Sequence, residues 1–240
     1  MRLDKCLGQA GFGSRNQIKK LLRGRQVRID GEIVTAINHI VDMDLQDIRV
    51  ADKKVEGLAS TYLLLNKPAG VVTAVSDQEH ETVLDCLAAE DRATGLYPVG
   101  RLDRDTEGLV LLTNNGPLGF RLLHPQYHID KTYYVEVNGP LEPDAPDFFA
   151  RGVTFLDGTV CNPAHLEVLS SGVEKSCAEI TISEGKFHQV KKMFLAYGVK
   201  VTYLRRIRFG EFHLGDLPVG AYRPLNTEEL QILKRYFKKK

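Results

Sequence analysis

The sequence predicts an α+β fold in which a small N-terminal module precedes a larger domain built on a mixed, mostly antiparallel sheet. Predicted strands and helices interleave without the regular strand–helix–strand spacing of a parallel sheet, and no glycine-rich phosphate loop is present. Of the 240 residues, 43% are hydrophobic and 26% are charged, which is typical of a globular protein and excludes a mostly disordered chain. A polar stretch at residues 51–60 is interpreted as a linker between a module at 1–50 and a domain at 61–240.

The N-terminal module is predicted to carry a cationic helix. Ser14 and Gln17 have the spacing of a capping box, and Gly24 ends the helix that they begin. Its apolar residues share one face, which leaves four cations largely off that face and free to meet a ligand: Arg15, Lys19, Lys20 and Arg23. A hairpin with a two-residue turn at Asp30-Gly31 and a short closing strand follow. Because fifty residues make a marginal core, we expect this module to be carried by a larger partner.

The larger domain alternates apolar runs and helical patterns. Strands are predicted at 62–65, 109–112, 132–137, 178–182 and 199–207. Helices are predicted at 82–90, 117–123, 143–151 and 189–197, and a last one is capped by Asn226 with Glu229.

The charge of the chain is unevenly distributed. The formal net charge of +1 is composed of about +6 in residues 1–30, −13 in 31–183 and +8 in 184–240. Basic ends that flank an acidic middle indicate a polyanionic partner such as RNA or DNA, contacted along one face.

Several classes of protein and site are disfavoured. No apolar run approaches 18 residues and no secretory signal is visible, so we expect a cytoplasmic protein with no membrane association. The four cysteines form no CxxC pair and are expected to be reduced thiols. Pro125 follows His124, so the HxxxH spacing with His128 does not predict a metal site, and we expect no metal.

Three stretches could carry chemistry. Residues 100–109 are dense in charged and hydroxyl groups yet lead into a buried strand, which suggests either a carboxylate at the floor of a cleft or an Arg–Asp network that pins a turn. Residues 184–194 place lysines at a helix start, where they could bind an anion, pair with Asp103 or simply be solvated. Adjacent Tyr133 and Tyr134 would face opposite sides of a strand, so one could meet a ligand.

At these residues the sequence resembles the bacterial rRNA pseudouridine synthases, most closely the small-subunit subfamily, over essentially its whole length. The N-terminal segment is similar to the S-four-like (αL) RNA-binding module at Arg2-Leu3-Asp4, Ser14-Arg15, Gly24, Val27, Asp30-Gly31 and Asp47-Ile48. The second segment shows Leu65-Asn66-Lys67-Pro68, Gly100-Arg101-Leu102-Asp103, Thr106, Gly108-Leu109, Thr113-Asn114, Lys131, Tyr133, Glu184-Gly185-Lys186 and His188-Gln189-Val190-Lys191. Several motifs in the same order are far more specific than any one of them.

The resemblance implies three catalytic residues. Asp103 matches the family's aspartate nucleophile, and Tyr133 matches the tyrosine that stacks on the base. Lys191 matches the basic residue that pairs with the aspartate, a position where many relatives have arginine. Contacts to RNA are expected from Arg101, Lys67, Lys186, His188 and Gln189, together with Arg15, Lys19 and Lys20 of the module.

The implied function is isomerisation of a specific uridine in 16S rRNA to pseudouridine after base flipping. No oxidation takes place and no group is added, so no cofactor is expected. The partner would be small-subunit RNA or an assembly intermediate, and the enzyme would act as a monomer.

The alternatives are a large-subunit rRNA pseudouridine synthase and a non-catalytic rRNA-binding assembly factor. A nuclease or glycosidase would require a metal cluster or paired carboxylates, and although Asp103 and Asp105 point the same way on an extended segment, the second has no matched role.

Overall fold

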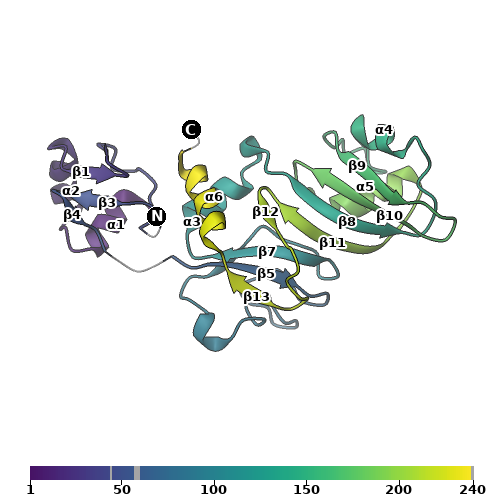
Figure 1. Ribbon diagram of the computed structural model, residues 1–240, viewed down its shortest axis with the longest axis horizontal. Helices are drawn as coiled ribbons and strands as arrows, with labels where there is room; N and C mark the ends of the chain where they lie inside the picture. Colours follow the sequence, from purple (N-terminus) through teal and green to yellow (C-terminus); the bar gives the residue numbers. More distant parts are fainter. Residues whose placement is uncertain (44, 57–59, 239–240) are drawn as a thin grey trace.

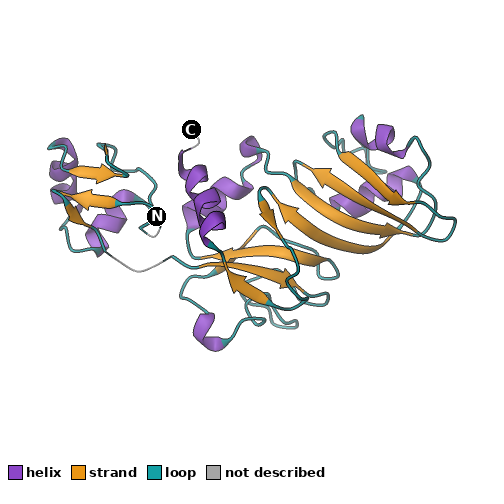
Figure 2. Cartoon of the chain, in the orientation of Figure 1, coloured by secondary structure: helices purple, strands orange, loops and turns teal. Residues whose placement is uncertain are grey.

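The protein is described by a computed structural model that covers residues 1–43, 45–56 and 60–238. The chain forms an elongated molecule with the N-terminal module at one end and the larger domain at the other (Figures 1 and 2). No helix among the described residues is long and apolar enough to cross a membrane.

The N-terminal module packs two helices on a small sheet. The helices are α1 (Leu3–Gln9) and α2 (Arg15–Arg23), and the predicted capping box of Ser14 and Gln17 begins α2. The sheet has the order β2-β1-β3-β4, with β1 at Val27–Ile29, β2 at Glu32–Ile33, β3 at Ile48–Val50 and β4 at Lys53–Lys54. Because β4 and the buried Val55 belong to this module, its structure extends past residue 50 into the expected linker.

The larger domain is built on one sheet with the order β13-β5-β7-β11-β8-β10-β9, in which β12 pairs with β11 and β6 with β7. Only the β7–β11 pair is parallel among the pairings of the described strands, so the predicted mixed, mostly antiparallel sheet is confirmed. The strands are β5 (Tyr62–Lys67), β6 (Tyr97–Val99), β7 (Glu107–Thr113), β8 (Lys131–Val137), β9 (His165–Ser170), β10 (Ser176–Ile182), β11 (Val201–Phe209), β12 (Phe212–His213) and β13 (Tyr222–Pro224).

The two halves of this sheet are covered differently. Strands β5 and β7 are nearly continuous apolar runs because both of their faces are buried. Helices α3 (Gly116–Leu123) and α6 (Thr227–Lys238) pack on one face of this half. Strand β10 alternates buried and partly exposed residues, since only one face is covered, by α4 (Ala145–Ala150) and α5 (Gln189–Tyr197).

The prediction of a helix at 82–90 is wrong. Apart from the short 3-10 turn η1 (Ala89–Asp91), this segment consists of bridges and turns; the other 3-10 turn, η2, is at Pro125–Tyr127. The Val83 amide donates to the carbonyl of Val72, and the Asp85 carboxylate accepts from the amide and hydroxyl of Thr82. The next backbone bonds, from the Asp85 amide to Thr82 and from the Leu87 amide to Leu84, each span three residues, so the segment forms successive turns and not an α-helix.

Gly108 allows the parallel contact between β7 and β11. It has a φ of +108°, and a Cβ built on it would lie 2.3 Å from the carbonyl oxygen of Arg206. Any other residue would push the two strands apart here, at the end of the loop 100–106. The glycine therefore brings β11 beside the loop that is densest in charge.

Lys67 fixes the position of that loop. Its side chain is 0% exposed, and Nζ donates to the carbonyls of Pro68, Arg104 and Thr106 at 2.9, 3.1 and 2.8 Å. Burial lowers the pKa of the Lys67 ammonium to about 8. Because this buried ammonium already donates to three backbone carbonyls and has no donor left for a ligand, the RNA contact expected for Lys67 is corrected to a structural role.

A buried carboxylate joins the module to the larger domain. Asp42 accepts hydrogen bonds from the Tyr62 hydroxyl at 2.5 Å and from Asn115 Nδ2 at 2.8 Å. An ion pair of 2.8 Å between Lys234 in α6 and Asp30 in the module hairpin forms a second link. The module is thus held by polar contacts on α6 and on the β5–β7 half of the sheet.

We expect Tyr62→Phe to lower the free energy of unfolding by roughly 1.5–3 kcal/mol, because it removes a hydrogen bond to a buried charged group. Urea denaturation measures this change. The control is Tyr127→Phe, because the Tyr127 hydroxyl makes no hydrogen bond to any of the described residues. Equal effects of the two substitutions would contradict a stabilising contact between Tyr62 and Asp42.

We expect Lys67→Met to cost roughly 2–4 kcal/mol of unfolding free energy, since three buried or partly buried hydrogen bonds from a charged donor are lost. Lys200→Met is the matched control, because the Lys200 side chain is exposed. If thermal and urea denaturation show the same stability for both variants, Lys67 does not hold the loop.

Candidate active site

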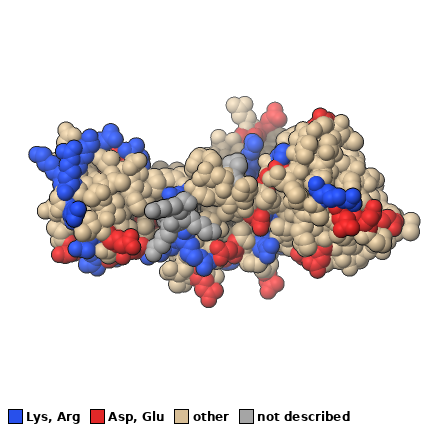
Figure 3. Space-filling view, turned by 90° about the horizontal axis from the view of Figure 1, so that it is seen from above, with Lys and Arg blue, Asp and Glu red and all other residues tan. Residues whose placement is uncertain are grey.

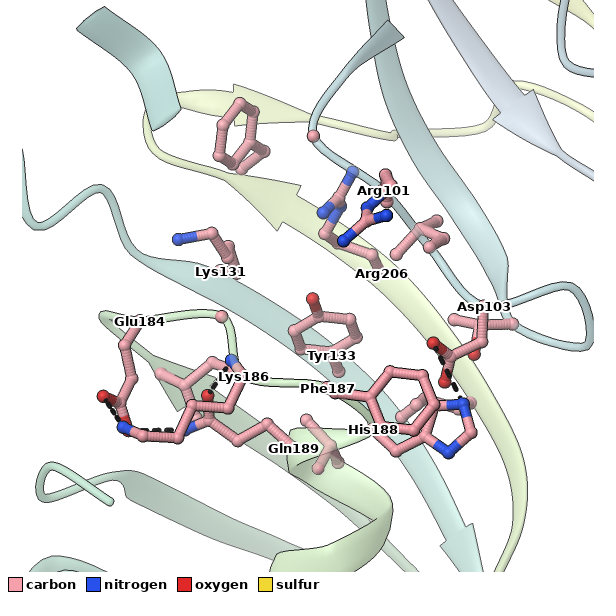
Figure 4. A pocket seen from close by; sticks show the side chains of 18 of the residues that line it. Arg101, Asp103, Lys131, Tyr133, Glu184, Lys186, Phe187, His188, Gln189 and Arg206 are labelled. Atoms are coloured by element: carbon pink, nitrogen blue, oxygen red, sulfur yellow. Dashed lines mark hydrogen bonds and ion pairs between the residues drawn. The ribbon is translucent and has the colours of Figure 1, made fainter. Parts of the chain in front are cut away.

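A cavity of about 1000 Å³ opens where the two halves of the sheet meet. Its walls include the loop 100–106, strand β8, the start of α5 with the preceding residues 182–188, and strand β11 (Figure 4). The end of α3 and residues 128–129 complete the lining on another side. Ion pairs and hydrogen bonds between these elements place acidic, basic and aromatic side chains around one space.

Asp103 and Lys191 form an ion pair in this cavity. Lys191 Nζ lies 3.0 Å from Asp103 Oδ2, although the two residues come from the loop before β7 and from α5. The Thr106 amide donates to the Asp103 carbonyl at 3.1 Å, and Thr73 Oγ1 donates to the carbonyl of Leu102 at 2.8 Å. The backbone on both sides of the Asp103 side chain is therefore held in place.

Asp105 is a second partner of the same ammonium, at 2.6 Å from Lys191 Nζ. Partial burial alone would raise the pKa of the Asp105 carboxyl, but the hydrogen bond and the charge of Lys191 lower it overall. Burial likewise opposes the charged form of Lys191, and its bonds to Asp105 and Asp103 still raise its pKa. Sequence reasoning assigned no role to Asp105; its spacing of two from Asp103 was the available signal.

Tyr133 supplies an aromatic wall. It lies on β8 and lines the cavity, whereas Tyr134 faces the other side of the sheet, where its hydroxyl donates to Glu136. The prediction that the two adjacent tyrosines face opposite sides of a strand is confirmed. Figure 4 shows the Tyr133 ring between Asp103 and the opposite wall of the cavity.

His188 and Phe187 form a stacked pair at the rim. Their ring centroids are 3.8 Å apart, and His188 Nε2 lies 3.7 Å from Asp103 Oδ1. His188 adopts a φ of +53°, and the helix α5 begins directly after it, as the sequence predicted. Phe187 is 73% exposed and was missed, although an apolar residue between Lys186 and His188 was a visible signal.

Gln189 is a buried structural residue. Its Nε2 donates to Glu184 Oε1 at 2.8 Å, and its Oε1 accepts from the Lys186 amide at 2.8 Å. Since both ends of the amide are used and only 4% of the residue is exposed, the expected RNA contact of Gln189 is corrected to positioning of this loop. The Lys186 ammonium forms an ion pair with Glu184 and lies on the cavity wall.

The remaining predicted RNA contacts are exposed cations. Arg101 lines the cavity, and its side chain is exposed. Arg15, Lys19 and Lys20 are exposed on α2 at the far end of the molecule, and Arg15 also pairs with Asp4 at 3.2 Å. Lys and Arg side chains gather over this end of the molecule (Figure 3). The structure therefore separates the predicted cations into one group at the cavity and one on the module.

In this cavity a carboxylate could react with a bound ligand while the ligand stacks against an aromatic ring. Among the described residues, no group of three or more His, Cys, Asp and Glu side chains is placed to hold a metal ion. The carboxylates beside Lys191 and the tyrosine face the same space.

Comparisons with known proteins agree with this arrangement. Residues 61–196 match the model of the RNA pseudouridylate synthase family, and residues 1–47 match the S4 domain. The chain is 42% identical over 233 residues to ribosomal small subunit pseudouridine synthase A of Yersinia pestis, covering 96% of this chain and 97% of that protein. It is 39% identical over 234 residues to the protein of the same name from Escherichia coli (strain K12), covering 96% and 98%.

A solved structure shows the same fold over the full length. The crystal structure of a pseudouridylate synthase is similar with a TM-score of 0.67 and 35% sequence identity, covering 97% of this chain and 99% of its own. The resemblance that the sequence motifs suggested is thereby confirmed. The chain belongs to the RNA pseudouridine synthase family of isomerases and carries an N-terminal S4 domain.

Proposed function

We propose that the substrate is one uridine of small-subunit rRNA, and that Asp103 is the nucleophile of the reaction. The choice of RNA is supported by relatives named for the small ribosomal subunit, which are about 40% identical over nearly the full length of the chain. The observation that carries the catalytic assignment is the ion pair of Asp103 with Lys191 in a cavity that Tyr133 also lines.

The reaction breaks the bond between ribose C1′ and uracil N1, rotates the base and joins C1′ to C5. The proton on C5 is lost and N1 gains one, so the composition of the nucleotide does not change. A carboxylate can act as a covalent partner for the sugar or the base in such a rearrangement. Lys191 provides the opposite charge that a carboxylate needs in a cavity closed by RNA.

Tyr133 would receive the flipped base. A uridine that leaves its helix loses stacking worth a few kcal/mol, and an aromatic face recovers roughly 1–3 kcal/mol per base. Arg101, exposed at the cavity, would contact the RNA where the base has left. Phe187, stacked on His188 at the rim, offers a second aromatic surface close to Asp103.

The S4 domain would hold the RNA at a distance from the reacting uridine. The exposed cations of α2 can contact phosphates, which position an RNA without reading its sequence. In this proposal a single chain acts in the cytoplasm on small-subunit RNA or on a particle that contains it.

The test is pseudouridine mapping of both rRNAs from cells that lack this gene, rescued with wild type or with Asp103→Asn. We expect one site to be lost from small-subunit rRNA and to return only with wild type, because an amide is not a nucleophile of this kind. Asp105→Asn is the matched variant, and we expect it to restore the site.

Other outcomes of the mapping are equally informative. A site lost from large-subunit rRNA would contradict the proposed substrate and leave the assigned residues in place. No change at any site would favour an rRNA-binding assembly factor instead. Rescue by Asp103→Asn would overturn the nucleophile.

A second prediction concerns the module. Lys19→Ala with Lys20→Ala should weaken rRNA binding and reduce the slope of log K against log salt by ~0.7–0.9 for each lost phosphate contact. Binding is measured at several salt concentrations, with Lys200→Ala as the control. An unchanged slope would exclude this face of α2 from RNA binding.

A further inference from the structure

Two cations in the cavity have no part in the chemistry proposed above. Arg206 lies on β11 directly opposite Tyr133 in the strand pairing, and Lys131 precedes Tyr133 by two residues on β8. Both line the cavity. Figure 4 shows them on the side of the Tyr133 ring toward which its hydroxyl points, away from Asp103.

Arg206 is buried with unused hydrogen-bonding capacity. The residue is 2% exposed, and its Nε donates to the Leu109 carbonyl at 2.8 Å. Its Nη2 is buried and has no hydrogen-bond partner among the described residues. A guanidinium carries five N–H donors, and leaving them unsatisfied away from water costs free energy.

The Lys131 side chain is also held by a hydrogen bond to a backbone carbonyl. Its Nζ donates to the Ile129 carbonyl at 2.7 Å, and no carboxylate of the described chain lies within ion-pair distance of it or of Arg206. The group that both cations share is the Phe209 ring, whose centroid is 5.8 Å from Lys131 Nζ and 5.2 Å from the Arg206 guanidinium carbon. An aromatic face attracts cations but does not neutralise their charge.

The surroundings of Lys131 disfavour its charged form. Burial first, and then the charge of Arg206, lower the pKa of Lys131 to about 8. Asp130 and Glu184 oppose this shift from a distance, and Glu184 is already engaged with Lys186 and Gln189. A buried Arg206 beside a partly buried Lys131, with no carboxylate of the described residues paired to either, is costly unless a ligand provides the opposite charge.

We infer that Arg206 and Lys131 form a subsite for one phosphodiester group next to the target uridine. The inference rests on the proposed RNA substrate and adds a named contact to it. A phosphodiester supplies the missing negative charge and also several acceptor oxygens, and the planar fork of an arginine matches it. A neutral uracil carbonyl would accept a hydrogen bond but would leave both charges unpaired.

This subsite differs in kind from the exposed cations of α2. Solvated lysines on a helix contact phosphates wherever the backbone passes. Arg206 is fixed by its bond to Leu109 and by the close approach of Gly108 to its backbone, so its remaining donors can bind a phosphate only in a fixed position. Binding there would set the register of the target nucleotide on Tyr133.

The main test is a double-mutant cycle between Lys131 and single phosphates of the RNA. In a short RNA containing the mapped uridine, each flanking phosphate is replaced in turn by an uncharged methylphosphonate, and binding to wild type and Lys131→Gln is measured. At one position we expect the replacement to weaken wild-type binding about tenfold and Lys131→Gln binding less than twofold, because the charged contact is already gone.

Arg206→Lys keeps the charge but loses the fork, and it should show an intermediate sensitivity at the same phosphate. Because Arg206 is buried, the partly exposed Lys131 carries the test if Arg206→Lys does not fold. Lys200→Gln is the control and should respond to every replacement as wild type does. Additive effects at all flanking phosphates would overturn the subsite.

A second measurement does not depend on the identity of the RNA. Inorganic phosphate is titrated into the full chain while the side-chain NMR signals of lysine are followed, with Lys131 assigned from Lys131→Gln. We expect phosphate to shift the Lys131 signal and raise its pKa, and Lys200 to be unaffected. If Lys131 responds no more than Lys200, the anion site is absent; if it responds but mapping finds no small-subunit site, only the proposed substrate has failed.

Discussion

The ion pair between Lys191 and Asp103 joins the two halves of the sheet, and the geometry of the cavity depends on it. Each partner is held by its own half. Val190 and Phe194 anchor α5 in the core beneath β8 and β10, while the Lys67 ammonium holds the loop that carries Asp103. Removing one charge of such a pair leaves the other uncompensated, so both halves must keep their positions for the carboxylate to be usable.

The role of each lysine and arginine in this protein depends on how buried its side chain is, and less on whether it is a lysine or an arginine. Lys67 is enclosed and serves the fold through three carbonyls, and Lys191 is shared by two carboxylates. Arg206 is enclosed as well, but among the described residues it has too few acceptors, which is why it implies a ligand. The lysines of α2 remain in water, where screened contacts to phosphate are exchangeable. Cationic side chains thus support the fold and pair with carboxylates, and in our proposals they also form an anion site and an RNA-binding surface.

Much of the fold could be predicted from local sequence. The helix 189–197 was predicted with the bounds that α5 has, because an apolar face and Gly198 define it, and the pair Asn226 and Glu229 forms the predicted cap of α6. The helix predicted at 82–90 is absent because the Val83 amide bonds to Val72, a partner that no local pattern reveals, and the following bonds close three-residue turns. Lys67 and Gln189 were misassigned for a related reason: a polar side chain in a motif looks available for a ligand until its burial is known.

The sequence by itself determined the two-part organisation, the mixed sheet and the family, because these depend on periodicity, caps and ordered motifs that are local in the chain. It also indicated that Lys191 could pair with Asp103. Only the tertiary structure decided which polar groups lie inside, that Asp105 shares Lys191, and that Arg206 and Lys131 enter the cavity together. Burial and distance between residues far apart in the chain arise from packing of the whole sheet, and they determine whether a charge is satisfied by the protein or requires a ligand.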